Sequence, residues 1–234
     1  LFLLLGIVLG FLLARPEAKR FKISGDELAI SIFYGLVPGF IGARLYHVID
    51  QWSVYAAEPG RIVATWDGGL GILGGLAGGL FGLWLFARRY RKPLLRVLDV
   101  WAPSVLLGQA IGRFGNWTNQ EAFGPPSDLP WAIAIDPAHR PAEYATAATF
   151  HPTFFYEAGF DLVGLAALLA FRPKLRAKPG AVLGAYLVIY GTGRFLVEFF
   201  RFDTAELAGV AVAHLIAAGL IGLGVWLVLR KNGD

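Results

Sequence analysis

The 234-residue chain contains no cysteine and no methionine, and only 16% of its residues are charged. Without cysteine, the chain has no disulfide, no thiolate metal ligand and no cysteine nucleophile of its own. A soluble domain carries roughly 25% charged residues, so this scarcity of charge argues against a soluble protein. Hydrophobic residues make up 56% of the chain and its mean hydropathy is +0.57, which together indicate a membrane protein.

Apolar stretches predict seven transmembrane helices, and hence an all-α polytopic membrane protein with a single integral-membrane domain over residues 1–234. The first stretch, 1–14, is shorter than the roughly 20 residues that a spanning helix needs, so we expect a helix truncated at the N-terminus. The others are 28–48, interrupted by Pro38, and 68–87, 98–111, 154–171, 181–200 and 208–229. Residues 116–152 contain six prolines and are expected to form a small extracytoplasmic segment between the fourth and fifth helices.

The basic residues predict the orientation of these helices. Fifteen of the 21 lysines and arginines, including every lysine, fall in alternate loops that would share one side of the membrane. Cytoplasmic loops of membrane proteins are enriched in lysine and arginine, so the N-terminus is expected outside and the C-terminus in the cytoplasm. The six remaining basic residues are all arginines: Arg44, Arg61, Arg113, Arg140, Arg194 and Arg201.

Three of these arginines, Arg113, Arg194 and Arg201, come from separate stretches that this topology places toward the outer side. Ionisable groups at membrane depth indicate a functional site, and arginine binds phosphate through paired hydrogen bonds. Facing a common cavity, the three would suit a phospholipid head group. The alternative is that each is paired with a nearby carboxylate, such as Arg194 with Glu198 four residues later.

Amides and a carboxylate follow Arg113 in the stretch Gly112-Arg-Phe-Gly-Asn-Trp-Thr-Asn-Gln-Glu-Ala-Phe-Gly124. Asn116, Asn119 and Glu121 would orient a head group or hold Arg113 in place. The alternative is that they satisfy the last carbonyl groups of a helix.

A histidine and a glutamate open the fifth predicted span, in His151-Pro-Thr-Phe-Phe-Tyr-Glu157. At a membrane boundary these two groups could transfer protons. The alternative is a simple helix entry, with Pro152 in its first turn and Tyr156 as an interfacial anchor. The single histidines His47 and His214 are expected to be structural.

Glycine is spaced at four-residue intervals between residues 68 and 79, for example at Gly71, Gly75 and Gly79. Small residues at this spacing let membrane helices approach closely, and the alternative is a smooth wall beside a lipid path. No phosphate-loop lysine or serine follows, so nucleotide binding is not expected.

The stretch 112–124 resembles the signature of the bacterial prolipoprotein diacylglyceryl transferases. Similar motifs follow the family's order along nearly the whole chain: Gly42-Ala-Arg-Leu-Tyr46, Trp66-Asp-Gly-Gly69, His151-Pro-Thr-Phe-Phe-Tyr-Glu157 and Tyr190-Gly-Thr-Gly-Arg-Phe-Leu-Val-Glu-Phe-Phe-Arg201. The resemblance implies a multi-pass enzyme of the bacterial plasma (inner) membrane, active at its outer face, with no metal, cofactor or nucleic acid. It would transfer the diacylglyceryl group of phosphatidylglycerol to the lipobox cysteine of a preprolipoprotein signal peptide, forming a thioether and releasing glycerol phosphate.

The resemblance also implies roles for individual residues. The expected catalytic group comprises Arg113 and Arg194 on the lipid phosphate, Glu121 and Glu198 holding them, and His151. Substrate-binding residues are expected to be Arg44, Arg113, Asn116, Asn119, Glu157, Tyr190, Arg194 and Arg201. Many members carry His-Gly-Gly in the third span, where this chain has Leu73-Gly74-Gly75, so His151 or Glu198 would have to replace that histidine as a base.

Two rival functions fit intramembrane arginines. A transporter or channel for an anionic solute would have charges through the bilayer depth or inverted repeats, and the sequence displays neither pattern. A catalytically inactive phospholipid-binding paralogue would fit Leu73, although the arginines and carboxylates of the motifs are retained.

Overall fold

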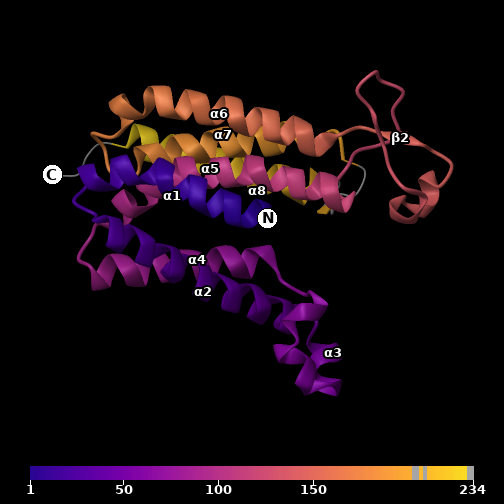
Figure 1. Ribbon diagram of the computed structural model, residues 1–234, viewed down its shortest axis with the longest axis horizontal. Helices are drawn as coiled ribbons and strands as arrows, with labels where there is room; N and C mark the ends of the chain where they lie inside the picture. The colour runs from indigo at the N-terminus through magenta and orange to yellow at the C-terminus, as the bar shows by residue number, and fades with distance from the viewer. Residues whose placement is uncertain (202–205, 208–209, 231–234) are drawn as a thin grey trace. The chain divides into compact units, whose positions relative to one another are not determined.

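The computed structural model describes residues 1–201, 206–207 and 210–230, and it is predominantly helical (Figure 1). Its α-helices are α1 Phe2–Arg20, α2 Gly25–Asp50, α3 Trp52–Ala57, α4 Ile72–Arg89, α5 Leu94–Asn119, α6 Thr153–Leu175, α7 Ala181–Glu198 and α8 Val212–Leu229. The 3-10 turns are η1 Pro59–Val63, η2 Thr65–Asp67, η3 Pro137–His139 and η4 Ala142–Tyr144. Two short antiparallel pairs join β1 Ile133–Ala134 to β2 Thr149–Phe150 and β3 Glu206–Leu207 to β4 Val210–Ala211.

Five helices, α2, α5, α6, α7 and α8, are long and apolar enough to cross a membrane, which is consistent with a polytopic membrane protein. The two other predicted spans correspond to α1 and α4. Residues 208–209, at the start of the last predicted span, lie outside the described residues, as does Lys231 of the C-terminal basic pair.

The helices have somewhat different ends from those predicted, as in α4, which begins at Ile72 rather than at 68, and two differences affect the interpretation. The expected interruption at Pro38 is wrong, because α2 runs without a break from Gly25 to Asp50. A proline removes only one backbone donor, and a membrane helix tolerates this when neighbouring groups and local adjustments compensate for it. The second difference is that α5 continues to Asn119, so residues 116–119 of the predicted extracytoplasmic segment belong to a helix.

The chain divides into two compact units, each described here by itself: a bundle unit of residues 1–14 and 99–234, and a hairpin unit of residues 15–98. In the hairpin unit, α2 and α4 pack antiparallel through glycine. A side-chain carbon at Gly74, Gly78 or Gly82 would collide with the carbonyl oxygen of Gly42, Pro38 or Tyr34, respectively. Such an approach brings helix backbones into direct contact, as small residues at four-residue spacing permit.

Of the predicted example, only Gly71 is crowded, because a side-chain carbon there would collide with the ring of Tyr46. A side-chain carbon at Gly75 or Gly79 would lie 3.5 Å from its nearest neighbour, which is an ordinary contact. The predicted close approach of helices is therefore present, with Gly74, Gly78 and Gly82 as its most crowded positions.

The bundle unit packs α5, α6 and α7 around buried apolar residues that include Leu106, Leu168 and Val182, and α8 packs against α7 (Figure 1). A buried carboxylate fixes the start of α7, since Asp99 accepts hydrogen bonds from the backbone N–H of Gly180 at 2.7 Å and of Leu183 at 2.9 Å. A negative charge at a helix N-terminus pairs with its free N–H groups and with the helix dipole. The contact thereby ties the beginning of α7 to α5.

The segment between α5 and α6 has its own small core. The pairing of β1 with β2 brings Ile135 and Phe150 beside Phe123 and Phe154, and all four side chains are buried. The Thr153 hydroxyl donates to the Ala122 carbonyl oxygen at 2.7 Å, joining the start of α6 to the residues that follow α5. Figure 1 shows β2 and its loops beyond the ends of α5, α6 and α7.

Replacing Gly78 by alanine should destabilise the hairpin unit, because the added methyl group meets the Pro38 carbonyl oxygen. Overpacking of this kind costs about 1–3 kcal/mol, which should lower the midpoint of thermal unfolding in detergent. Gly222→Ala on α8 is the matched control, since nothing lies within 4 Å of a side-chain carbon there. Equal melting temperatures for the two variants would contradict the packing described here.

Candidate active site

The bundle unit brings charged residues from four segments to one end. Arg113 lies near the end of α5, Glu157 in the second turn of α6, Arg194 near the end of α7, and Arg201 just beyond α7. Because α5 and α7 run in one direction and α6 in the other, two helix ends and one helix start meet here. The expected convergence of Arg113, Arg194 and Arg201 is present in the structure.

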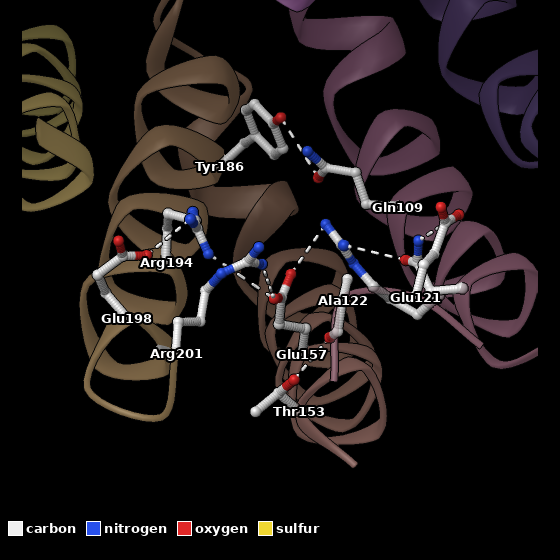
Figure 2. Close-up of polar contacts among 11 residues, drawn as sticks. Gln109, Glu121, Ala122, Thr153, Glu157, Tyr186, Arg194, Glu198 and Arg201 are labelled. Atoms are coloured by element: carbon white, nitrogen blue, oxygen red, sulfur yellow. Dashed lines mark hydrogen bonds and ion pairs between the residues drawn. The ribbon is translucent and has the colours of Figure 1, made fainter. Parts of the chain in front are cut away.

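All three arginines converge on a single carboxylate, that of Glu157 (Figure 2). Arg113 Nη2 lies 2.8 Å from Glu157 Oε2, while Arg194 Nη1 and Arg201 Nη1 lie 3.8 and 3.9 Å from Oε1. The arginine side chains are 22% or 23% exposed, whereas that of Glu157 is 8% exposed. The guanidinium groups are therefore within reach of a ligand that approaches from the surface.

A second carboxylate holds one of these arginines from the side. Glu198 Oε2 lies 2.7 Å from Arg194 Nη2, so the pair expected from the four-residue spacing is formed. Glu198 is buried, and a buried carboxylate needs such a partner. Arg194 thus contacts one carboxylate on its own helix and approaches another on α6.

The amides after Arg113 form a chain of hydrogen bonds. Arg113 Nη1 donates to Asn116 Oδ1 at 3.2 Å, and Asn116 Nδ2 donates to Glu121 Oε1 at 3.2 Å. Asn119 Nδ2 donates to the same Glu121 oxygen at 3.1 Å. These bonds favour side chains that hold one another and Arg113 over side chains that satisfy the last carbonyl groups of the helix.

Glu121 was expected to hold Arg113, and it does so only through Asn116. The direct ionic partner of Arg113 is Glu157, from a different helix. The physical reason is the helix end: Gln120 and Ala122 adopt positive φ angles of 51° and 56°, which turn the chain away after Asn119. Hydrogen bonds between Gln120 and Asp136 then fix the turn against the following loop.

His151 lies among aromatic side chains beside the arginine cluster. Its Nδ1 atom is 3.1 Å from the Tyr156 hydroxyl, which also accepts a hydrogen bond from Trp131 Nε1 at 2.8 Å. The ring of Phe200 is near both His151 and Tyr156. Among the described residues, His151 makes no hydrogen bond or ion pair with the three arginines or with Glu198.

Arg44 belongs to the hairpin unit, where all of its donor nitrogens bind main-chain carbonyl groups. Nε donates to Ile62, Nη1 to Gly68 and Gly69, and Nη2 to Arg61 and Ala64. These bonds hold the irregular stretch between α3 and α4. Arg44 was expected to bind substrate, but in this structure its hydrogen-bonding capacity is taken up by the loop.

A cavity of about 170 Å³ lies beside this arginine within the hairpin unit and is lined by His47, Tyr55 and Asp67, among others. The ring of His47 packs edge-on against that of Tyr55, at a centroid distance of 5.9 Å. His47 thus both packs against a neighbouring ring and lines the cavity, and its expected structural role stays a prediction.

Three polar residues that sequence reasoning did not place in the site lie next to it. Asp161, one helical turn beyond Glu157, is buried and lines a cavity of about 10 Å³ with Tyr190 and Arg194. Tyr186 stacks on Tyr190 and its hydroxyl donates to Gln109 Oε1 at 3.4 Å (Figure 2). An acidic residue four positions after Glu157 on an apolar helix was the available signal for Asp161.

Comparisons with known proteins agree with the motifs. A family model described as prolipoprotein diacylglyceryl transferase matches residues 1–230. A protein of Gloeobacter violaceus named phosphatidylglycerol–prolipoprotein diacylglyceryl transferase is 39% identical over 238 residues, covering 99% of this chain and 88% of the relative. Relatives of the same name from Trichormus variabilis (40% identical; 97% of this chain and 83% of the relative) and Frankia alni (42%; 100% and 63%) are also similar. This chain belongs to the prolipoprotein diacylglyceryl transferase family.

Proposed function

We propose that the protein is a phosphatidylglycerol–prolipoprotein diacylglyceryl transferase and that its reaction takes place at the arginine cluster. It would transfer a diacylglyceryl group from phosphatidylglycerol to the lipobox cysteine in the signal peptide of a preprolipoprotein. The observation that carries this proposal is the convergence of Arg113, Arg194 and Arg201 at one end of the helix bundle. Family membership supports the reaction, and the cluster is where the lipid phosphate would bind.

The chemistry of the transfer suits such a cluster. The thiol gives up its proton, its sulfur bonds to the glyceryl carbon, and the carbon–oxygen bond to phosphate breaks. The electron pair of that bond leaves with glycerol phosphate, so negative charge grows on the phosphate oxygens. Fixed guanidinium groups stabilise this growing charge, and positive charge nearby also favours the reactive thiolate. The chain has no cysteine, and the protein substrate provides the thiol.

We assign roles by position around the cluster. Arg113, Arg194 and Arg201 would contact the phosphate, while Asn116, Asn119 and Tyr190 would contact the glycerol head group. Glu198 would hold Arg194 directly, and Glu121 would hold Arg113 through Asn116. Because its donors are already engaged by carbonyl groups, Arg44 would position a loop rather than bind the lipid.

We further propose seven membrane spans, made by the five apolar helices together with α1 and α4. The N-terminus would lie outside and the C-terminus in the cytoplasm of a bacterial inner membrane. Within α6, Arg172 and Lys174 lie at the opposite end from Glu157, as expected if the basic end is cytoplasmic and the site faces outward. Residues 120–152 would then form the extracytoplasmic segment.

The transporter alternative is not favoured, because the relatives that match nearly the whole chain are named as transferases. The inactive paralogue makes a different experimental prediction. It would bind phosphatidylglycerol without releasing glycerol phosphate in the presence of a lipobox peptide.

The direct test is a transfer assay in nanodiscs with phosphatidylglycerol and a lipobox peptide, reading glycerol phosphate release and peptide mass. Arg194→Ala should lower the transfer rate by about 100-fold or more, because it removes a donor aimed at the developing charge. Arg194→Lys should retain part of the activity, since lysine keeps the charge but loses the paired geometry. Turnover like that of the wild type in a folded Arg194→Ala protein would refute the role.

Two controls make this assay specific. A peptide with serine in place of its cysteine should give no release, and Arg15→Ala, which removes an exposed arginine of the hairpin unit, should leave the rate unchanged. Thermal unfolding of each variant shows whether it is folded, since Arg194→Ala leaves Glu198 without its ionic partner.

His151→Asn separates a base from a positioning residue. Asparagine can retain a hydrogen bond to the Tyr156 hydroxyl but cannot take a proton at neutral pH. We expect the variant to retain most of the wild-type activity and the same pH profile. The reason is that His151 contacts Tyr156 and Phe200 rather than the arginine cluster. Loss of about 100-fold or more in the maximal rate, as general-base catalysis implies, would instead make His151 the base.

A further inference from the structure

The Glu157 carboxylate occupies the centre of the place that the proposed function gives to the lipid phosphate. Arg113, Arg194 and Arg201 all converge on it, from three different segments of the bundle unit (Figure 2). A carboxylate and a phosphodiester each carry one negative charge and offer oxygens that accept hydrogen bonds from arginine. Both anions therefore suit the same position.

The two oxygens of Glu157 are held differently. Oε2 lies 2.8 Å from Arg113 Nη2, a distance typical of a charge-assisted hydrogen bond. Oε1 is buried, has no hydrogen-bond partner among the residues that the structure describes, and lies 3.8 and 3.9 Å from Arg194 and Arg201. These distances exceed the hydrogen-bond range, so Oε1 is attracted to two guanidinium groups without being bound to either.

The cavity beside this carboxylate is small. The cavity lined by Glu157, Tyr190 and Arg194 has a volume of about 10 Å³, close to the smallest volume that holds one water molecule. A phosphate that reaches Arg194 through this cavity must therefore displace a group that already lines it. The loosely held Oε1 is the group in its way.

We propose that Glu157 is an internal competitor for the lipid phosphate, a role that rests on the proposed function of the site. The phosphate displaces Oε1 from Arg194 and Arg201, while Oε2 keeps its contact with Arg113. Before substrate arrives, the carboxylate neutralises guanidinium groups that would be costly to leave unpaired at membrane depth. Binding is then an exchange of one anion for another.

The test compares the dissociation constant of phosphatidylglycerol for the full-length wild type and for Glu157→Gln, both in nanodiscs of zwitterionic lipid. Glutamine has nearly the same shape but cannot compete as an anion. We expect binding to tighten by about tenfold, as loss of a competing charge at a part-buried ion pair allows. If Glu157 only holds the arginines in place, the substitution disorders them and binding weakens instead.

Glu198→Gln is the charge-matched control, because it removes the same charge from a residue that, among the described residues, is paired with Arg194. Competition predicts little tightening in this variant. Equal tightening in both variants, or unchanged or weaker binding in Glu157→Gln, would overturn the proposal. If Glu157→Gln does not fold, Glu157→Asp replaces it in the test. The shorter side chain keeps the charge but moves the carboxylate away from Arg194 and Arg201, so phosphatidylglycerol should bind severalfold more tightly. Weaker binding would again overturn the proposal.

The outcome can be separated from that of the proposed function. A wild type that transfers diacylglyceryl groups, together with a Glu157→Gln variant that does not bind lipid more tightly, would refute the competitor role alone. A wild type that neither binds phosphatidylglycerol nor transfers it would overturn both.

Discussion

The meeting of three arginines at Glu157 is the interaction on which the rest of the structure depends. A guanidinium group within a membrane protein costs free energy unless an anion or several hydrogen-bond acceptors contact it. Here one carboxylate serves three cations, so none of them is fully satisfied by it. The arrangement leaves more positive than negative charge around Glu157, as the proposed phosphate site requires.

The bundle supports this site through contacts that lie outside it. Asp99 ties the start of α7 to α5 at the far end, so that Arg194 is presented opposite Arg113. The segment after α5 is joined to α6 through Thr153, which places the amide chain beside the cluster. Rigid helices carry the charged groups, and hydrogen bonds at the helix ends set their orientation. Such support is what a site needs when it stabilises charge in a transition state.

Much of this architecture could be predicted from the sequence, because its signals are strong ones. Long apolar stretches gave the helices, and arginines within them pointed to the cluster. The boundaries were harder, since α5 continues to Asn119 through polar residues and α2 passes Pro38 without a break. The hydrogen bonds of Arg44 could not be predicted, because every residue has a main-chain carbonyl group and the sequence does not show which of them bind a given side chain. Glu157 as the shared partner depends on how helices pack, which spacing along one chain does not show.

The most direct measurement is an experimental structure of the protein in a nanodisc with phosphatidylglycerol bound. The account predicts lipid phosphate oxygens within hydrogen-bond distance of Arg194 and Arg201, with Glu157 still in contact with Arg113. Phosphate bound elsewhere, with all three arginines still gathered around Glu157, would contradict the claim that this cluster is the lipid site.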